Sequence, residues 1–328
     1  MALLLSLAAC CGHPFNTWAL VDAASQANTN APADGSPWDS MGHVSAPLPF
    51  VGSGYGGIYL GAGWVLTAQH AAAGDTWFGN TLFPWDGTSV RMTNSNGTGT
   101  DMQMFHLRAL PPLPRMPLTT TTPAANAQVD MIGYGFIGGS AQTTIGTNIG
   151  FHLSANQYKS WGNNRATGGT VLVTDDYGNI TSLATVFNAP PSQTSDECQA
   201  EAGDSGGGVF EKNGSTWQLV GMMYGIDAQV SGAAVYNDVT YSADIRTYRT
   251  QIAAVIAATR PVLSISRSGA NVMVCWPDTG VTYNLYANHS LATTGWSQLN
   301  PALTLTNGQY CALLPNTNSP NFYRLKTP

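Results

Sequence analysis

The strongest chemical signal in the sequence is the pentapeptide GDSGG at residues 203–207. A serine hydroxyl is an effective nucleophile only when it is exposed, held in one rotamer and deprotonated as it attacks. Flanking glycines let the backbone turn sharply and approach a substrate carbonyl closely. In such a turn the N–H groups of Gly203 and Ser205 point at one place and stabilise a developing oxyanion. We therefore expect Ser205 to be a nucleophile, with Gly203 and Ser205 forming an oxyanion hole; the simpler alternative is a glycine-rich β-turn.

A histidine that follows an apolar stretch is the candidate partner of this serine. Residues 64–70 read WVLTAQH and end in His70. Imidazole is the side chain whose ordinary pKa allows it to accept and return a proton near neutral pH. We therefore expect His70 to be the general base. The remaining histidines are interpreted as structural, and they are His13, His43, His106, His152 and His289.

Together, VLTAQH at 65–70 and GDSGG at 203–207 resemble the trypsin/chymotrypsin superfamily of serine endopeptidases. Further segments resemble that family in the same order along the chain, and these are GGIYL at 56–60, IGYG at 132–135, VGMMYG at 220–225 and AVY at 234–236. The likeness covers about residues 37–258. It implies an all-β fold of two six-stranded-type β-barrels with a C-terminal helix, a protein or peptide substrate, an acyl-enzyme, and no cofactor or metal.

The resemblance also implies a carboxylate that orients the base and comes from the start of an apolar strand between the two motifs. Asp101 fits this place, because it precedes an apolar run and lies just before a proline-rich stretch at 109–124. Asp130 is the main competitor, but it lies in the strand that leads into IGYG. Asp75 and Asp86 stand in loop-like sequence. The ordering therefore favours Asp101.

Substrate preference is less clear from the sequence. By the resemblance, the base of the primary pocket is the residue six positions before the nucleophile, which is Gln199. An uncharged amide there does not support a preference for lysine or arginine. Met223 and Tyr224 are candidates for an apolar wall, and buried strand residues are the equally good alternative. We expect an apolar or uncharged substrate side chain before the cleaved bond.

The family's Ile-Val-Gly-Gly activation terminus is absent from the region about 40 residues before His70. We therefore expect that Asp204 does not pair with a new N-terminus. Arg165 is the candidate internal cation that would replace it. The acidic stretch DDYGN at 175–179 is predicted to be a hairpin turn rather than a calcium site.

The spacing of apolar residues predicts the elements that position these groups. Short apolar runs alternate with turn residues from about 36 to 110 and again from about 125 to 240, which is typical of β-barrels. One amphipathic helix is predicted over 242–257, with Ser242 as N-cap, Asp244 in the first turn and Pro261 beyond its end. The protease-like domain is thus predicted over 36–258.

Residues 262–328 are predicted to form a separate small β-sandwich-like domain that resembles fibronectin-III modules. Our default interpretation is a spacer or surface-attachment domain. A carbohydrate platform made of Tyr286, Trp296 and Tyr310 is the alternative. Cys275 and Cys311 both lie on predicted strands of this domain and are candidates to pair.

Residues 1–35 are predicted to be a signal, leader and linker. The first nine residues read MALLLSLAA, which is typical of the end of a secretory signal, and Cys10 is an alternative lipid-attachment site. We expect an extracellular or periplasmic protein, by plain secretion or as a lipoprotein.

The composition narrows the functional classes. Of 328 residues, 12 are Lys or Arg and 18 are Asp or Glu, so no basic surface for nucleic acid is expected. No apolar run reaches the length of a membrane span. The sequence therefore predicts a secreted serine endopeptidase. A protease-fold binding or adhesion protein without turnover is the alternative, and an esterase on the same scaffold is a third.

Overall fold

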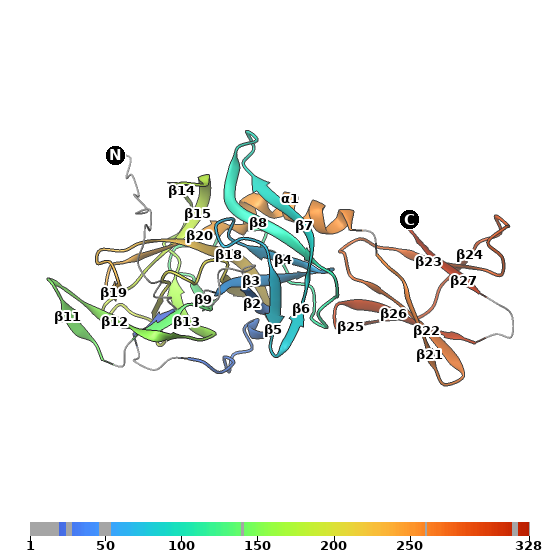
Figure 1. The fold of residues 1–328 in the computed structure, drawn as a ribbon, viewed down its shortest axis with the longest axis horizontal. Coiled ribbons are helices and arrows are strands. Elements are labelled where there is room, and N and C mark those ends of the chain that lie inside the picture. The colour runs from blue at the N-terminus through green and yellow to red at the C-terminus, as the bar shows by residue number, and fades with distance from the viewer. Residues whose placement is uncertain are drawn as a thin grey trace.

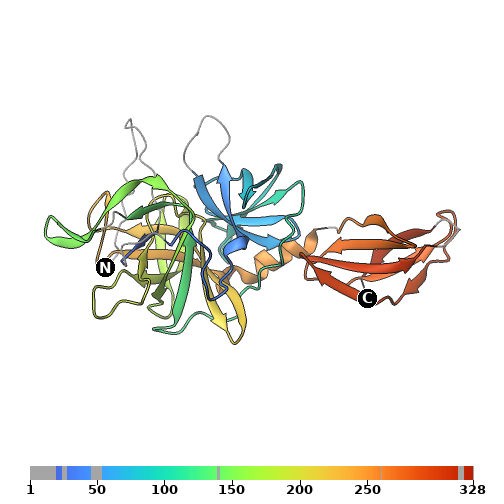
Figure 2. The same cartoon turned by 90° about the horizontal axis from the view of Figure 1, so that it is seen from below.

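The computed structural model describes residues 20–23, 28–45, 54–138, 141–259, 261–316 and 321–327. Within these ranges the chain is almost entirely β-structure with one α-helix, so the all-β prediction is confirmed (Figures 1 and 2). None of the helices in the described part is long and apolar enough to cross a membrane.

The first half is a seven-stranded antiparallel sheet. Its strands in spatial order are β6 (Thr81–Phe83), β5 (Asp75–Phe78), β2 (Met41–Ser45), β3 (Gly54–Gly61), β4 (Trp64–Thr67), β8 (Gly99–Leu107) and β7 (Trp85–Thr93). A short 3-10 helix, η1 (Trp38–Ser40), leads into β2.

The second half contains another seven-stranded sheet. Its spatial order is β13 (Ser160–Arg165), β9 (Gln128–Gly133), β17 (Gly208–Asn213), β18 (Thr216–Asp227), β20 (Val239–Asp244), β15 (Gly178–Val186) and β14 (Val171–Asp175). Smaller strands extend this half, and these are β10 (Phe136–Gly138), β11 (Thr143–Ile145), β12 (Asn148–Gln157), β16 (Cys198–Gln199) and β19 (Ala233–Val235). The two large sheets agree with the predicted pair of barrels, although each has seven strands rather than six.

The helix α1 (Ile245–Ala258) follows β20 and joins the two halves. Its buried residues recur at helical spacing, as predicted, and they are Ile245, Tyr248, Ile252 and Ile256. They belong to one core cluster that also contains residues of both large sheets, such as Met104 and Met222. Burial of these apolar side chains in a shared core holds the two halves in a fixed relation. A site assembled from both halves requires this.

The predicted N-cap of this helix is wrong. Strand β20 continues through Ser242 to Asp244, so the helix begins at Ile245. The Asp244 carboxylate accepts hydrogen bonds from the backbone N–H of Thr247 at 3.2 Å and from its hydroxyl at 2.7 Å. Asp244 is therefore the cap, because a side-chain oxygen satisfies an N–H group that the first turn leaves free.

The linker prediction is wrong for the described residues before 36. Strand β1 (Val21–Asp22) pairs with β16, with Val21 opposite Gln199, and Leu20 is only 2% exposed. Further along, the Trp161 indole donates a hydrogen bond to the Asn30 carbonyl at 2.9 Å. This segment is therefore packed into the second half. The predicted signal and Cys10 lie outside the described residues.

The last part of the chain forms two further sheets beyond α1 (Figures 1 and 2). One contains β21 (Ser264–Ser268), β22 (Asn271–Pro277), β26 (Gln309–Pro315) and β25 (Leu303–Thr306), and the other contains β24 (Ser297–Leu299), β23 (Asn284–Asn288) and β27 (Phe322–Lys326). Trp276 of the first sheet and Leu285 of the second share one small core, as in a sandwich. The exact domain boundaries stay predictions.

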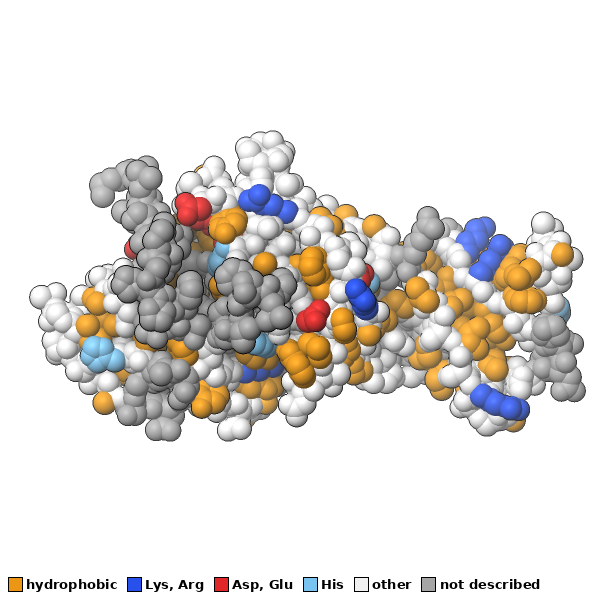
Figure 3. All heavy atoms as spheres, in the orientation of Figure 1, with side chains coloured by type: hydrophobic (Ala, Val, Ile, Leu, Met, Phe, Trp, Pro, Cys, Tyr) orange, Lys and Arg blue, Asp and Glu red, His pale blue; other side chains and the backbone are white. Residues whose placement is uncertain are grey.

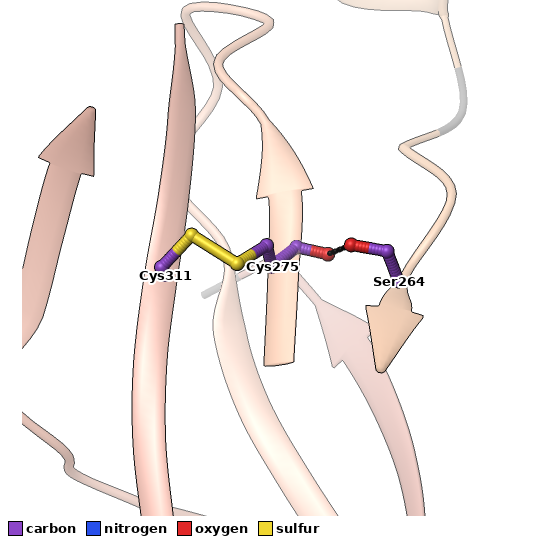
Figure 4. Close-up of a disulfide and its surroundings, with 3 residues drawn as sticks. All are labelled: Ser264, Cys275 and Cys311. Atoms are coloured by element: carbon purple, nitrogen blue, oxygen red, sulfur yellow. Dashed lines mark hydrogen bonds between the residues drawn. A yellow bond between two sulfur atoms is a disulfide. The ribbon is translucent and has the colours of Figure 1, made fainter. Parts of the chain in front are cut away.

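A disulfide joins Cys275 to Cys311 in this part of the chain. The two cysteines are direct partners on neighbouring strands β22 and β26, and Ser264 on β21 donates a hydrogen bond to the Cys275 carbonyl at 3.3 Å (Figure 4). The bond therefore ties together two strands of a sheet that has only a small core. Cys198, by contrast, is a free and fully buried thiol.

Candidate active site

The predicted serine, histidine and aspartate lie together between the two halves. His70 follows β4 and Asp101 belongs to β8, so both come from the first half, whereas Ser205 lies in the turn before β17 of the second half. His70 Nε2 is 2.7 Å from Ser205 Oγ, and His70 Nδ1 is 2.5 Å from Asp101 Oδ2. Three groups that are distant in the sequence thus form one continuous hydrogen-bonded line.

Asp101 holds the imidazole of His70 in position through two contacts. The carboxylate is 2% exposed, and its other oxygen accepts a hydrogen bond from the His70 backbone N–H at 2.9 Å. An ionised carboxylate beside Nδ1 favours the tautomer in which Nδ1 carries the proton. Nε2 is then the acceptor that faces the Ser205 hydroxyl, which is the arrangement a general base needs.

The competing carboxylates lie elsewhere. Asp130 is on β9 of the second half, where burial and the neighbouring Asp34 carboxyl raise its pKa to about 7. Asp75 accepts a hydrogen bond from the Trp85 backbone N–H. Asp86 does pair with a histidine, but the other ring nitrogen of that His106 faces the Ala62 carbonyl rather than a hydroxyl. Only Asp101 among these four lies on a line that reaches Ser205.

The turn that carries Ser205 is held from both sides. The Gly206 N–H donates to the Met223 carbonyl at 2.7 Å, and the Gly56 N–H of the first half donates to the Ser205 carbonyl at 2.9 Å. Gly203 has φ +101°, and a Cβ on Gly206 would lie 2.0 Å from the Gly56 carbonyl oxygen. The glycines at 203 and 206 are therefore required by a positive φ and by a close approach of two backbones.

The two predicted oxyanion donors have no backbone acceptor among the residues that the structure describes. No carbonyl of the described residues accepts a hydrogen bond from the backbone N–H of Gly203 or Ser205. Two such donors next to a nucleophilic oxygen are what stabilisation of a developing negative charge requires. The oxyanion role of Gly203 and Ser205 stays a prediction.

Asp204 is buried behind this turn and is surrounded by backbone donors. Its carboxylate accepts hydrogen bonds from the N–H groups of Gly135 at 2.9 Å and Glu201 at 3.1 Å. The backbone N–H groups of Leu20 and Tyr134 also favour its charged form. Burial nevertheless raises the pKa of Asp204 to about 8, since the N–H groups offset only part of the desolvation.

The prediction that Arg165 pairs with Asp204 is wrong. The Arg165 guanidinium donates to the Ser192 carbonyl at 2.9 Å and not to Asp204. Instead, the backbone N–H of Leu20 lies at the Asp204 carboxylate, although the sequence predicted no N-terminal segment beside this residue. The sequence signal was weak, because the apolar run WALV at 18–21 is short and lies in a stretch whose polar residues predicted a linker.

The predicted pocket residues do not all share one side of their strands. Gln199 is fully buried, and its amide nitrogen and oxygen have no hydrogen-bond partner within the described part of the chain. Met223 packs with Leu20 and Cys198, next to Gln199 in the sequence. Tyr224 points the other way, because side chains alternate along a strand, and its hydroxyl is 2.5 Å from Ser182 Oγ. The pocket role stays a prediction, and the geometry separates Tyr224 from the other two residues.

Sequence reasoning missed two tyrosines that flank the imidazole. The Tyr55 ring centre is 6.0 Å from that of His70 in an edge-on contact, and the Tyr177 ring centre is 5.8 Å away at 44°. The hairpin turn predicted at 175–179 is present between β14 and β15. Nothing in its local sequence shows that it reaches His70, because this contact depends on the packing of the two halves.

No group of three or more histidine, cysteine, aspartate or glutamate side chains in the described ranges is arranged to hold a metal ion.

Comparisons with known proteins give a likeness of fold. No protein-family model matches the sequence, and no curated protein sequence matches it either. Among solved structures, an inactive mutant form of Rv3671c from M. tuberculosis H37Rv is 19% identical, with a TM-score of 0.44 over 72% of this chain and 100% of that one. The inactive form of the Rv3671c protease is 18% identical, with a TM-score of 0.43 over 70% of this chain and 98% of that one. Kallikrein-related peptidase 10 is 18% identical, with a TM-score of 0.45 over 70% of this chain and 100% of that one. At these scores the functional conclusion rests on the geometry of the site alone.

Proposed function

We propose that this chain is a secreted serine endopeptidase that hydrolyses peptide bonds through an acyl-enzyme. The observation that carries the proposal is the line from Ser205 Oγ to His70 Nε2 at 2.7 Å and from His70 Nδ1 to Asp101 Oδ2 at 2.5 Å. A hydroxyl, an imidazole and a buried carboxylate in this order form a nucleophile, a base and the group that orients the base.

The reaction follows from these contacts. Ser205 Oγ attacks the peptide carbonyl carbon while its proton passes to His70 Nε2, and the carbonyl electron pair moves onto oxygen. The N–H groups of Gly203 and Ser205 stabilise that oxyanion. When it collapses, the C–N bond breaks and His70 gives the proton to the departing amine. Water then attacks the ester carbon with His70 again as base, which releases the acid and restores the serine.

A free strand edge beside Ser205 supports a peptide substrate. Strand β17 pairs with β18 only as far as Met222, whereas β20 continues along the other side of β18 to Asp227. Among the described strands, residues 224–227 therefore have a paired neighbour on one side only. An extended peptide can pair with such an edge through its main chain, which places one of its carbonyls near the nucleophile.

The C-terminal sheets support an oxidising compartment outside the cytoplasm. The Cys275–Cys311 disulfide is the supporting observation, since such bonds persist in extracellular and periplasmic proteins. We keep the C-terminal sheets as a spacer or surface-attachment domain. Of the three aromatic residues considered as a glycan platform, Tyr286 and Trp296 both pack on Arg324, whereas Tyr310 packs near Trp276 on the other sheet.

Covalent labelling tests the proposal. A fluorophosphonate probe should modify the wild-type chain and the Ser215→Ala control, in which an exposed serine of the β17–β18 turn is removed. It should not modify Ser205→Ala, and His70→Ala should react far more slowly. If the wild-type chain is neither labelled nor able to hydrolyse a peptide or an ester, the protein is a binding or adhesion protein with this fold. If it cleaves esters but no amides, it is an esterase.

A further inference from the structure

A hairpin of the second half reaches across to the first half beside the active site. Strands β14 and β15 pair up to Asp175 and Gly178, which leaves Asp176 and Tyr177 as the turn. Gly178 has φ +120°, and a Cβ on it would lie 2.5 Å from the Gly99 carbonyl oxygen at the start of β8. The turn therefore packs directly on the strand that carries Asp101. Figure 1 shows this hairpin beside β7 and β8.

Side chains of β7 and the following turn fasten this hairpin. Arg91 donates one hydrogen bond to the Thr100 carbonyl at 2.9 Å and another to the Tyr177 carbonyl. Asn94 donates to the Asn179 carbonyl at 2.8 Å. One guanidinium thus connects the residue before Asp101 with the residue at the tip of the hairpin.

The fastened tip holds the Tyr177 ring against the catalytic imidazole. The ring centres are 5.8 Å apart, yet 39% of the Tyr177 surface remains exposed. Acidic and apolar side chains are adjacent on the surface where the hairpin ends (Figure 3). A large aromatic side chain whose backbone is held in place, but whose face is still accessible, is suited to contact a substrate.

An extended substrate bound for attack by Ser205 can place one side chain in this region. Successive side chains of an extended peptide point to opposite sides. If the residue with the attacked carbonyl points into the second half, near Gln199 and Met223, the preceding residue points away from it. That direction leads to His70, with Tyr177 beside it.

We propose that Tyr177 is a specificity-determining residue, whose ring closes the space next to His70 and admits only a small side chain on the substrate residue that precedes the cleaved one. Arg91 is the positioning residue that holds Tyr177 there. This inference rests on the proposed function, since it needs a peptide bound for attack by Ser205.

Two esters that differ only in this side chain test the inference. N-acetyl-Ala-Ala and N-acetyl-Phe-Ala thiobenzyl esters share the attacked residue and the leaving group. The wild-type chain should favour the alanine ester in kcat/KM by about tenfold or more, the range by which pockets discriminate side-chain size. Tyr177→Ala should bring the two values within about threefold of each other, mainly by lowering KM for the phenylalanine ester.

Matched variants distinguish a change in substrate specificity from a general loss of activity. Tyr177→Phe keeps the ring and should keep the preference. Tyr158→Ala should also keep it, since Tyr158 is an exposed tyrosine of the same half whose ring is not among those that contact His70. Arg91→Gln should lose the preference while the fluorophosphonate still labels Ser205, and Arg91→Lys should restore part of it.

The outcomes distinguish this inference from the proposed function. If Tyr177→Ala is labelled like the wild type but keeps the full preference, or if the wild type shows no preference, Tyr177 does not select the substrate. If Arg91→Gln slows both esters equally, Arg91 has only a structural role. If no variant and no wild-type chain is labelled, the proposed function is overturned, and this inference with it.

Discussion

A chain that begins at Leu20 should lose less stability between about pH 5 and pH 8 than the full chain does. The reason is the buried carboxyl of Asp204, and the backbone N–H of Leu20 is one of the groups that favour its charged form. No lysine or arginine of the described residues forms an ion pair with it. Removing residues 1–19 replaces the Leu20 amide by an α-ammonium group and so places a positive charge at the carboxyl.

The size of the effect follows from the pKa of Asp204, which burial raises from the ordinary 3.8 to about 8. An acid whose folded pKa is raised binds its proton more tightly when folded. The full chain is therefore penalised progressively as the pH rises from about 4 to about 8, by at most roughly 6 kcal/mol at 1.4 kcal/mol per pH unit. An ammonium about 4 Å away attracts the ionised Asp204 carboxylate by about 4 kcal/mol at the effective dielectric constant of protein sites. This attraction stabilises the folded, ionised chain and lowers the pKa of the carboxyl by about three.

Guanidinium unfolding of both chains at the two pH values measures this difference. Both should carry Ser205→Ala, so that self-cleavage does not interfere. The full chain should lose several kcal/mol from about pH 5 to pH 8, and the chain beginning at Leu20 should lose much less. Asp204→Asn should abolish the difference between them. Equal losses in the two chains would refute the reasoning about Leu20 and Asp204.

Three further predictions concern other parts of the molecule. Asp101→Asn should fold like the wild type but lower kcat by roughly 10⁴, because an amide beside Nδ1 favours the wrong tautomer of His70; unchanged kcat would mean that Asp101 does not orient the base. Gly206→Ala should destabilise the fold and abolish labelling of Ser205, since a Cβ there lies 2.0 Å from the Gly56 carbonyl oxygen; a stable, labelled variant in thermal unfolding would contradict the placement of this turn. Cys275→Ala with Cys311→Ala should destabilise the C-terminal sheets by about 4 kcal/mol, from the chain entropy of a 36-residue separation, without changing hydrolysis of a small ester; equal denaturation midpoints with and without the bond would refute this.

The parts of the site that were predictable from the sequence are those carried by local motifs. Ser205 and His70 lie in short segments whose glycines and small residues are needed locally, and Asp101 followed from the order of the segments. The inner face of the helix was also predictable, because Ile245, Tyr248 and Ile252 recur at its period.

The contacts that escaped prediction are long-range ones. Strand β1 has only two residues, so no alternation marks it, and its partner β16 lies more than half of the chain away in the sequence. The contact of Tyr177 with His70 depends on how a hairpin of one half packs on the other. The helix N-cap is Asp244 rather than the predicted Ser242, because the preceding strand β20 is paired as far as Asp244. In each case tertiary packing, rather than local preference, decides the outcome.

The most direct test of the central claim is to trap the covalent intermediate. An activated alanine ester can be mixed with the wild-type chain, the reaction stopped in acid, and the chain digested and analysed by mass spectrometry. The acyl group should be found on the peptide that contains Ser205, and it should be absent from the Ser205→Ala chain. Steady hydrolysis with no acylated peptide, or an acyl group on another residue, would contradict a nucleophilic role for Ser205.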